Sequence, residues 1–240
     1  MKRLAFIFLV AVSCKTAHVS LQQDFATSAE SYEVQGKNGW QVNQVINFGP
    51  YETSKIDRSM TFSYLVPFLV DFSGGKESLA FNIVNKEAGA GVNFLGDSRL
   101  KDNHLSLAKG YFQIPLKQKD VFAGAIYFSQ PGLQRFDFLL LNPNNQQLTA
   151  KCQGVVLDEK GDEYFTIKGI TKLQGSKIPQ TQAFGYEFLQ GDKVVGAVET
   201  LNKGRVWFDT SLSERDRLLL SSLATGLLVR NNLQEEVENL

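Results

Sequence analysis

Three kinds of side chain in this chain of 240 residues could do chemistry. The thiols of Cys14 and Cys152 could react or take a covalent modification. His104, in the run DNH, could serve as a general base beside a serine. Residues 158–163 read DEKGDE, and their four carboxylates could attract Ca²⁺, which prefers oxygen ligands. The surrounding sequence decides between these functions and purely structural roles.

The sequence around His104 and around the acidic run favours structural roles. No G-x-S-x-G motif or other nucleophile signature accompanies His104, so we interpret it as a polar residue at the start of a strand. Residues 158–163 lack the D-x-D-x-D-G spacing of a calcium-binding loop, and a solvated β-turn explains them better. Gly89-Ala90-Gly91 lacks the G-x-G-x-x-G pattern of a dinucleotide-binding turn, and we interpret it as a flexible loop. We therefore predict no catalytic residue and no enzymatic activity.

The first fourteen residues give Cys14 a distinct context. They read MKRLAFIFLVAVSC, with a basic pair at Lys2 and Arg3 followed by an uninterrupted apolar stretch over residues 4–12. This stretch is too short to cross a bilayer core, which needs ~20 apolar residues. Residues 1–13 are therefore predicted to be a secretory signal peptide.

The end of this segment resembles the lipobox of bacterial lipoproteins, because small or aliphatic residues (Ala11, Val12 and Ser13) directly precede Cys14. Ala11 departs from the Leu that is most common at the first lipobox position. The resemblance implies that the signal is cut before Cys14, that the thiol takes a diacylglyceryl group and that the new N-terminus is acylated, typically by palmitate. It also implies a lipid-anchored protein of the bacterial cell envelope. Lys15 in place of an Asp favours the outer membrane. The alternative is an ordinary signal peptide followed by a cysteine.

Cys152 would then be the only free thiol, so no disulfide is expected within the chain. It lies in an alternation of Leu148, Ala150, Cys152 and Gly154, which is typical of a buried small apolar residue. With Cys14 assigned to lipid, too few thiols and imidazoles are left for a usual four-ligand zinc site. We predict no metal site and no cofactor.

Most of the chain after residue 31 alternates between apolar and polar residues, as half-buried antiparallel strands do. Trp40, Val42, Gln44, Ile46 and Phe48 share one such face, and Asn38-Gly39 before them favours a type I′ hairpin turn. Residues 15–30 have no such period and are interpreted as a spacer with some helical tendency. Further strands are expected at 61–70, 79–84, 105–108, 111–116, 121–129, 136–141, 147–157, 163–173, 184–190, 194–201 and 205–208.

The C-terminal part breaks the strand pattern. Ser211 lies three residues before Glu214, as in a capping box, and RDRLLLSSLATGLLVR follows from residue 215 to 230. Its apolar residues surround the helix on nearly all sides, so a helix near 212–230 must be buried. We predict a mainly β fold: a single antiparallel β-barrel of about twelve strands around a hydrophobic C-terminal helix.

Most of the aromatic residues are expected in the core of such a barrel. If some are exposed, they would form an apolar patch or groove for a lipid or a protein. Pro67 marks an edge or a bulge. The aromatic residues concerned are Phe62, Tyr64, Phe68, Phe72, Phe122, Tyr127, Phe128, Phe136 and Phe138.

The last third resembles the closing section of the tubby C-terminal-like superfamily, which includes the LURP-one-related and phospholipid-scramblase-like proteins. The matching pieces are a glycine-turned hairpin over residues 185–201, the strand through Trp207 with an Asp after it, and the apolar helix. The resemblance implies a twelve-stranded barrel with the helix threaded through its middle. The basic phosphoinositide cluster of tubby and the cysteine-rich and calcium segments of scramblases have no counterpart here, so the resemblance supports the fold and little of the function.

Together these observations predict three parts: the signal peptide at 1–13, a lipidated N-terminus and tether at 14–30, and one barrel domain at 31–240. Without Lys2 and Arg3, 23 basic residues face 25 acidic ones, which offers no footprint for nucleic acid. We expect a non-enzymatic module that is anchored to the membrane and binds a lipid or an envelope protein. A structural or assembly accessory of the envelope is the alternative, and a hydrolase using His104 is the least favoured.

Overall fold

The computed structural model describes residues 16–38, 43–58, 64–66, 70–72, 77–101, 119–129, 134–143, 153–180 and 182–230. The predicted signal peptide, Cys14, His104, Cys152 and Pro67 lie outside these residues, as do the strands expected at 105–108 and 111–116. The two described helices are α1 (Gln23–Ser28) and α2 (Glu214–Val229). The described strands are β1 (Glu30–Glu33), β2 (Asn47–Phe48), β3 (Tyr51–Thr53), β4 (Tyr64–Val66), β5 (Val70–Phe72), β6 (Glu77–Asn85), β7 (Ala90–Lys101), β8 (Lys119–Phe128), β9 (Arg135–Pro143), β10 (Gln153–Leu157), β11 (Glu163–Ile170), β12 (Gly185–Gln190), β13 (Lys193–Glu199) and β14 (Arg205–Phe208).

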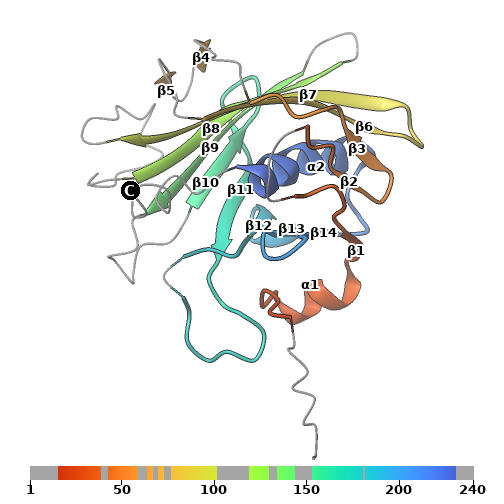
Figure 1. The fold of residues 1–240 in the computed structure, drawn as a ribbon, viewed down its shortest axis with the longest axis vertical. Helices are drawn as coiled ribbons and strands as arrows, with labels where there is room; N and C mark the ends of the chain where they lie inside the picture. The colour runs from red at the N-terminus through yellow and green to blue at the C-terminus, as the bar shows by residue number, and fades with distance from the viewer. Residues whose placement is uncertain are drawn as a thin grey trace, which may run out of the picture.

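Twelve of these strands form one antiparallel sheet that curls into a nearly closed barrel (Figure 1). Strands β6 to β14 are neighbours in chain order, β3 and β2 continue the sheet beyond β6, and β1 pairs with β14. The two edges meet at one bridge. There the Gln35 N–H donates to the Asn47 carbonyl at 2.9 Å, and the Asn47 N–H donates back at 3.2 Å. Strands β4 and β5 form a separate hairpin. The predicted barrel of about twelve strands is confirmed.

Helix α2 fills the interior of this barrel, as the sequence predicted (Figure 1). Every residue of α2 from Leu218 to Val229 is buried. A Cβ atom on Gly226 would lie 2.4 Å from the ring of Phe94, so glycine allows the helix to approach β7 closely. The Phe94 ring stacks on Phe81 and on Phe138, with ring centroids 4.6 and 5.2 Å apart. The interior is therefore a packed core.

The start of α2 differs from the predicted capping box. The N-cap is Ser213, whose hydroxyl oxygen accepts from the Asp216 N–H at 3.1 Å. Ser211 does not cap the helix; its N–H donates to the Asp209 carboxylate at 2.9 Å. Hydrogen bonds from Lys193 and Ser211 lower the pKa of Asp209 to about 2. The predicted pair of Ser211 and Glu214 is wrong because Asp209 takes Ser211 into a turn before the helix begins.

The C-terminal end of α2 is held by a half-buried arginine. The Arg58 guanidinium donates to the Val229 carbonyl at 2.6 Å and to the Gln44 side chain at 3.2 Å, and it pairs with Glu77. A cation at this position complements the negative end of the helix dipole.

One expectation for the N-terminal half is corrected, and another lies outside the described residues. Gly39 of the hairpin turn expected at Asn38-Gly39 is not among the described residues. In the described part of the strand expected at Trp40–Phe48, only β2 joins the ladder, and Asn43 has a positive φ of 55°. The expected alternation in burial still holds, since Gln44, Ile46 and Phe48 are buried.

The sequence at Gly89-Ala90-Gly91 is also not a flexible loop. Gly89, with a φ of 65°, ends a tight turn, and β7 begins at Ala90. Positive φ is a conformation that glycine adopts without steric cost, so this turn fits the sequence closely.

Candidate functional site

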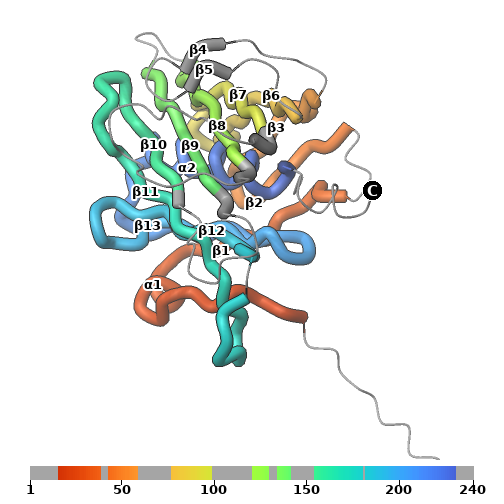
Figure 2. Tube along the Cα trace, turned by 90° about the vertical axis from the view of Figure 1, so that its left-hand side faces the viewer, coloured from red at the N-terminus to blue at the C-terminus, as the bar shows by residue number. Residues whose placement is uncertain are grey.

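Residues 17–29, called the docked segment below, lie against the outer face of β12, β13 and β14. Val19 bridges Leu173, where the Ser20 N–H donates to the Lys172 carbonyl and the Gln174 N–H to the His18 carbonyl, both at 2.8 Å. Figures 1 and 2 show this part of the chain and α1 at one end of the molecule. The spacer expected before residue 31 is therefore fixed to the barrel over most of its length.

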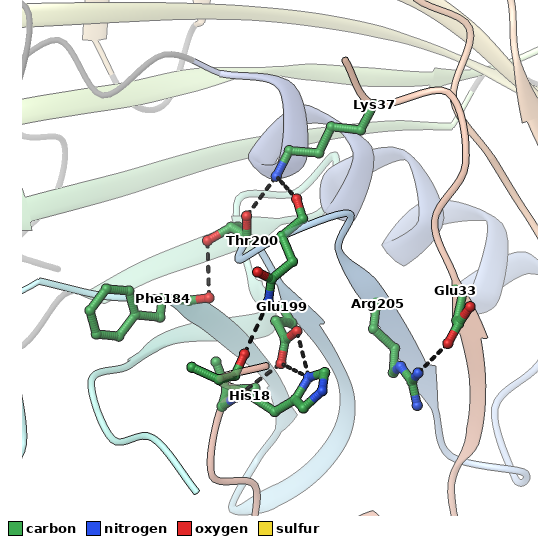
Figure 3. Close-up of polar contacts among 10 residues, drawn as sticks. His18, Glu33, Lys37, Phe184, Glu199, Thr200 and Arg205 are labelled. Atoms are coloured by element: carbon green, nitrogen blue, oxygen red, sulfur yellow. Dashed lines mark hydrogen bonds and ion pairs between the residues drawn. The ribbon is translucent and has the colours of Figure 1, made fainter. Parts of the chain in front are cut away.

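A buried carboxylate on β13 holds the start of the docked segment (Figure 3). Glu199 is 2% exposed and accepts from the Val19 N–H at 2.9 Å and from His18 Nδ1 at 3.1 Å. The side chain points outward because its neighbour Val198 packs into the core. Two contacts to one buried carboxylate fix the chain at residues 18 and 19.

Lys37 ties the next loop to the same place. Its Nζ donates to the Thr200 carbonyl at 2.6 Å and to the Asn202 carbonyl at 3.3 Å (Figure 3). Burial lowers the pKa of Lys37, and the nearby Glu199 charge partly offsets this effect. The Asn202 amide donates in turn to the Ala17 carbonyl at 3.0 Å. The turn after β13 therefore contacts both the docked segment and the loop that follows β1.

Helix α1 covers the outer face of β13 and β14 with a small apolar cluster. Phe25 packs with Val194 and Ala197, which are all buried, and with the half-buried Trp207. Glu187, on the neighbouring strand β12, is buried, and burial raises the pKa of its carboxyl group. Lys168 and the backbone N–H of Gln22 act against this rise.

This arrangement holds a chain segment in place against the barrel. Glu199 orients the His18 imidazole, as carboxylates do in catalytic pairs. The same carboxylate also accepts from the Val19 backbone N–H, so the pair is part of the contact that holds the docked segment. Within the described ranges, no group of three or more His, Cys, Asp or Glu side chains is placed to hold a metal ion. These contacts fix the point at which the chain leaves the barrel toward its N-terminus.

The acidic run at 158–163 forms the turn between β10 and β11, as the sequence predicted. One Asp158 carboxylate oxygen accepts from the N–H groups of Lys160 at 2.9 Å and of Asp162 at 3.0 Å. Glu159 accepts from the Arg135 N–H at 2.9 Å. The carboxylates thus organise the hairpin itself.

The expected aromatic core is confirmed for Phe122, Phe136 and Phe138, which are buried. Tyr127 and Phe128 are half-buried, and arginine side chains lie over their rings: Arg135 over Tyr127 at 5.4 Å and Arg215 over Phe128 at 5.7 Å. Phe62, Phe68 and the side chains of Tyr64 and Phe72 lie outside the description.

The sequence interpretation missed the docking contacts of His18 and Glu199, which lie 181 residues apart. One signal was available. Glu187, Ala197 and Glu199 occupy outward positions on strands whose other side is core, and a small apolar residue among acids there indicates a covered face.

No protein-family model matches this chain, and neither curated proteins nor solved structures give a match. Among the described residues, neither helix has the length and apolar character needed to cross a bilayer.

Proposed function

We propose that this chain is a lipid-anchored protein of the bacterial cell envelope, held by acyl groups on Cys14, and that its barrel serves as a non-catalytic binding or interaction module. The signal-like residues 1–13 and the small residues before Cys14 are the sequence basis for the anchor. The proposed destination is the outer membrane.

The docked segment is the observation that carries this proposal. Its first fixed group is the Ala17 carbonyl, which accepts from Asn202. Three residue steps separate Ala17 from Cys14, and a chain of that length reaches roughly 10 Å. A lipid on Cys14 would therefore hold the barrel directly at the membrane surface. That short connection is useful to a protein that must present one face to the membrane and the others to a partner.

The filled interior supports binding at the outer surface. Helix α2 and aromatic side chains such as Phe94 and Phe138 occupy the space inside the barrel. Tyr164 and Arg215 lie at one end of the helix, where the guanidinium stands over the Tyr164 ring at 5.8 Å. A ligand or partner would therefore meet the barrel wall and its loops.

Metabolic labelling tests the anchor. Cells expressing the wild type, Cys14→Ala or Cys152→Ala are grown with radiolabelled palmitate, and the purified proteins are compared by autoradiography and intact mass. We expect label and the added acyl mass in the wild type and in Cys152→Ala, and loss of both in Cys14→Ala. Equal labelling of all three proteins, or none in the wild type, would contradict lipidation at Cys14.

Capture experiments test the interaction module. The lipidated protein is extracted in mild detergent and examined by native mass spectrometry, with a detergent-matched lipoprotein of unrelated fold as the control. A partner or lipid retained by this protein and not by the control is expected. A bare protein in both native spectra and pull-downs would count against a binding role.

A further inference from the structure

Residues 171–180, called the 171–180 loop below, form a built turn beside the start of the docked segment. The Gln180 N–H closes the base of the loop by donating to the Thr171 carbonyl at 2.8 Å. Ser176 shapes its tip, because its hydroxyl donates to the Ile178 carbonyl at 2.9 Å. Gly175, with a φ of 78°, provides the reversal. The backbone of the loop is therefore held in place by its own hydrogen bonds.

The loop and the docked segment hold each other in place. The backbone hydrogen bonds that surround the Val19–Leu173 bridge join the two directly. Figure 1 shows the loop in turquoise at the same end of the molecule as α1, and Figure 2 shows the same neighbourhood from the side. Whatever lies next to Cys14 must also lie close to this loop.

The chemistry of the loop tip suits an anionic lipid surface. Ile178 is 72% exposed, far more than Val45, the other exposed large apolar residue recorded for the described chain. Lys177 directly precedes Ile178 and Lys172 lies at the base of the loop; both are exposed, as is Lys203 on the turn beside Ala17. The sequence contains no Asp or Glu in residues 171–180 or in residues 16–23. Lysines attract anionic headgroups, and an apolar side chain among them enters the boundary between headgroups and acyl chains.

The short stretch of chain between Cys14 and the docked segment favours the bilayer as the partner that contacts this loop. A lipid on Cys14 would lie within roughly 10 Å of Ala17, which is comparable to the thickness of the interfacial region of one leaflet. A protein partner on the loop would have to fit into that narrow space. The membrane itself fills it.

We infer that the 171–180 loop is a membrane-contacting loop, with Ile178 inserted at the interface and Lys172 and Lys177 on anionic headgroups, so that the barrel has one fixed orientation on the bilayer. This inference rests on the proposed lipid anchor at Cys14. The anchor supplies the attachment, and the loop supplies the direction in which the barrel faces.

Site-specific fluorescence tests the orientation with the full lipidated protein. Ile178→Cys and Glu87→Cys are labelled with an environment-sensitive probe and reconstituted in vesicles of phosphatidylethanolamine and phosphatidylglycerol. Glu87 is exposed in the turn between β6 and β7, and these two strands lie away from the loop in both views. Wild type carried through the same labelling reports any reaction at Cys152.

We expect a blue-shifted emission and strong quenching by spin-labelled lipid at position 178, and neither at position 87. Adding Lys172→Glu and Lys177→Glu to the Ile178→Cys protein should reduce the quenching severalfold. A water-like emission at 178 in protein whose mass shows lipidated Cys14 would overturn the loop contact and leave the anchor standing. An unmodified Cys14 in the same mass spectrum would overturn the proposed function, and the argument for this loop with it.

Discussion

Helix α2 and the docked segment cover opposite faces of β13. On the inner face, leucines of α2 pack against the barrel wall, and a Cβ on Gly196 would already lie 3.1 Å from Leu220. On the outer face, Phe25 makes a small apolar cluster and the Val19 side chain is buried, while polar contacts such as the Val19 N–H on Glu199 add to them. The inner cover depends on apolar area, whereas the outer cover depends on a few directed contacts.

This difference determines which of the two covering segments can detach while the barrel stays folded. Each fully buried leucine contributes about 1.5–3 kcal/mol through burial alone, so removing α2 would cost the whole fold. The docked segment buries two apolar side chains, Val19 and Phe25, and its hydrogen bonds exchange with water at a small net cost. We therefore expect the docked segment to open locally while the barrel stays folded.

Truncating the inner cover should have the largest effect. Leu220→Ala removes a side chain that is fully buried and leaves a cavity, so we expect a loss of about 3 kcal/mol in the free energy of unfolding. The matched change on the outer cover is Leu21→Ala, because Leu21 is half-buried against the Phe25 cluster, and it should cost under about 1 kcal/mol. Urea unfolding followed by circular dichroism measures both. Equal losses in the free energy of unfolding would mean that α2 and the docked segment stabilise the barrel in the same way.

The sequence predicted the inner cover far better than the outer one, for a physical reason. Burial on all sides of residues 218–229 follows from their composition, and the hairpin of β12 and β13 follows from alternation and from Gly191, which has a φ of 59°. These signals are local. The docked segment has no period, and its binding depends on Glu199, 180 residues from Val19. The outward residues Glu187, Ala197 and Glu199 indicate that this face is covered, but a contact of that separation does not show in the sequence which segment covers it.

The residue that caps the start of α2 was also not predictable from the neighbouring sequence alone. Ser211 and Ser213 each lie three residues before an acidic residue, so spacing alone could not choose between them. The choice depends on Asp209, which binds Ser211 and is itself paired with Lys193 at 2.8 Å. The tertiary contact from β13 decides which serine caps the helix.

Loosening the outer cover should be the next largest effect, and it should be local. Phe25→Ala removes the central side chain of the outer cluster, and we expect the free energy of local opening to fall by about 2 kcal/mol, or about 30-fold in the opening equilibrium. Hydrogen exchange at the Val19 and Ser20 amides measures this, with the exposed Gln23→Ala as control. The urea midpoint of the barrel should move little. If the midpoint falls as far as in Leu220→Ala, the docked segment is part of the cooperative core.

The smallest effect is expected at Glu187, and it should have the opposite sign. Burial raises the pKa of this carboxyl in the folded protein, so the folded state holds its proton more tightly than the unfolded state. The resulting stabilisation is present below the unfolded pKa, near 4.5, and is lost as the pH rises through the folded pKa. Glu187→Gln stays neutral at every pH and can still accept from the Gln22 N–H.

We therefore expect Glu187→Gln to be more stable than the wild type at neutral pH, by under about 1 kcal/mol, and to match it at pH 4. Urea unfolding across this pH range, with the exposed Glu87→Gln as control, checks the sign. A variant that is less stable than the wild type at neutral pH would show that the attraction of Lys168 for the ionised carboxylate outweighs its burial. The outer cover would then be held by charge, and high salt should release the docked segment.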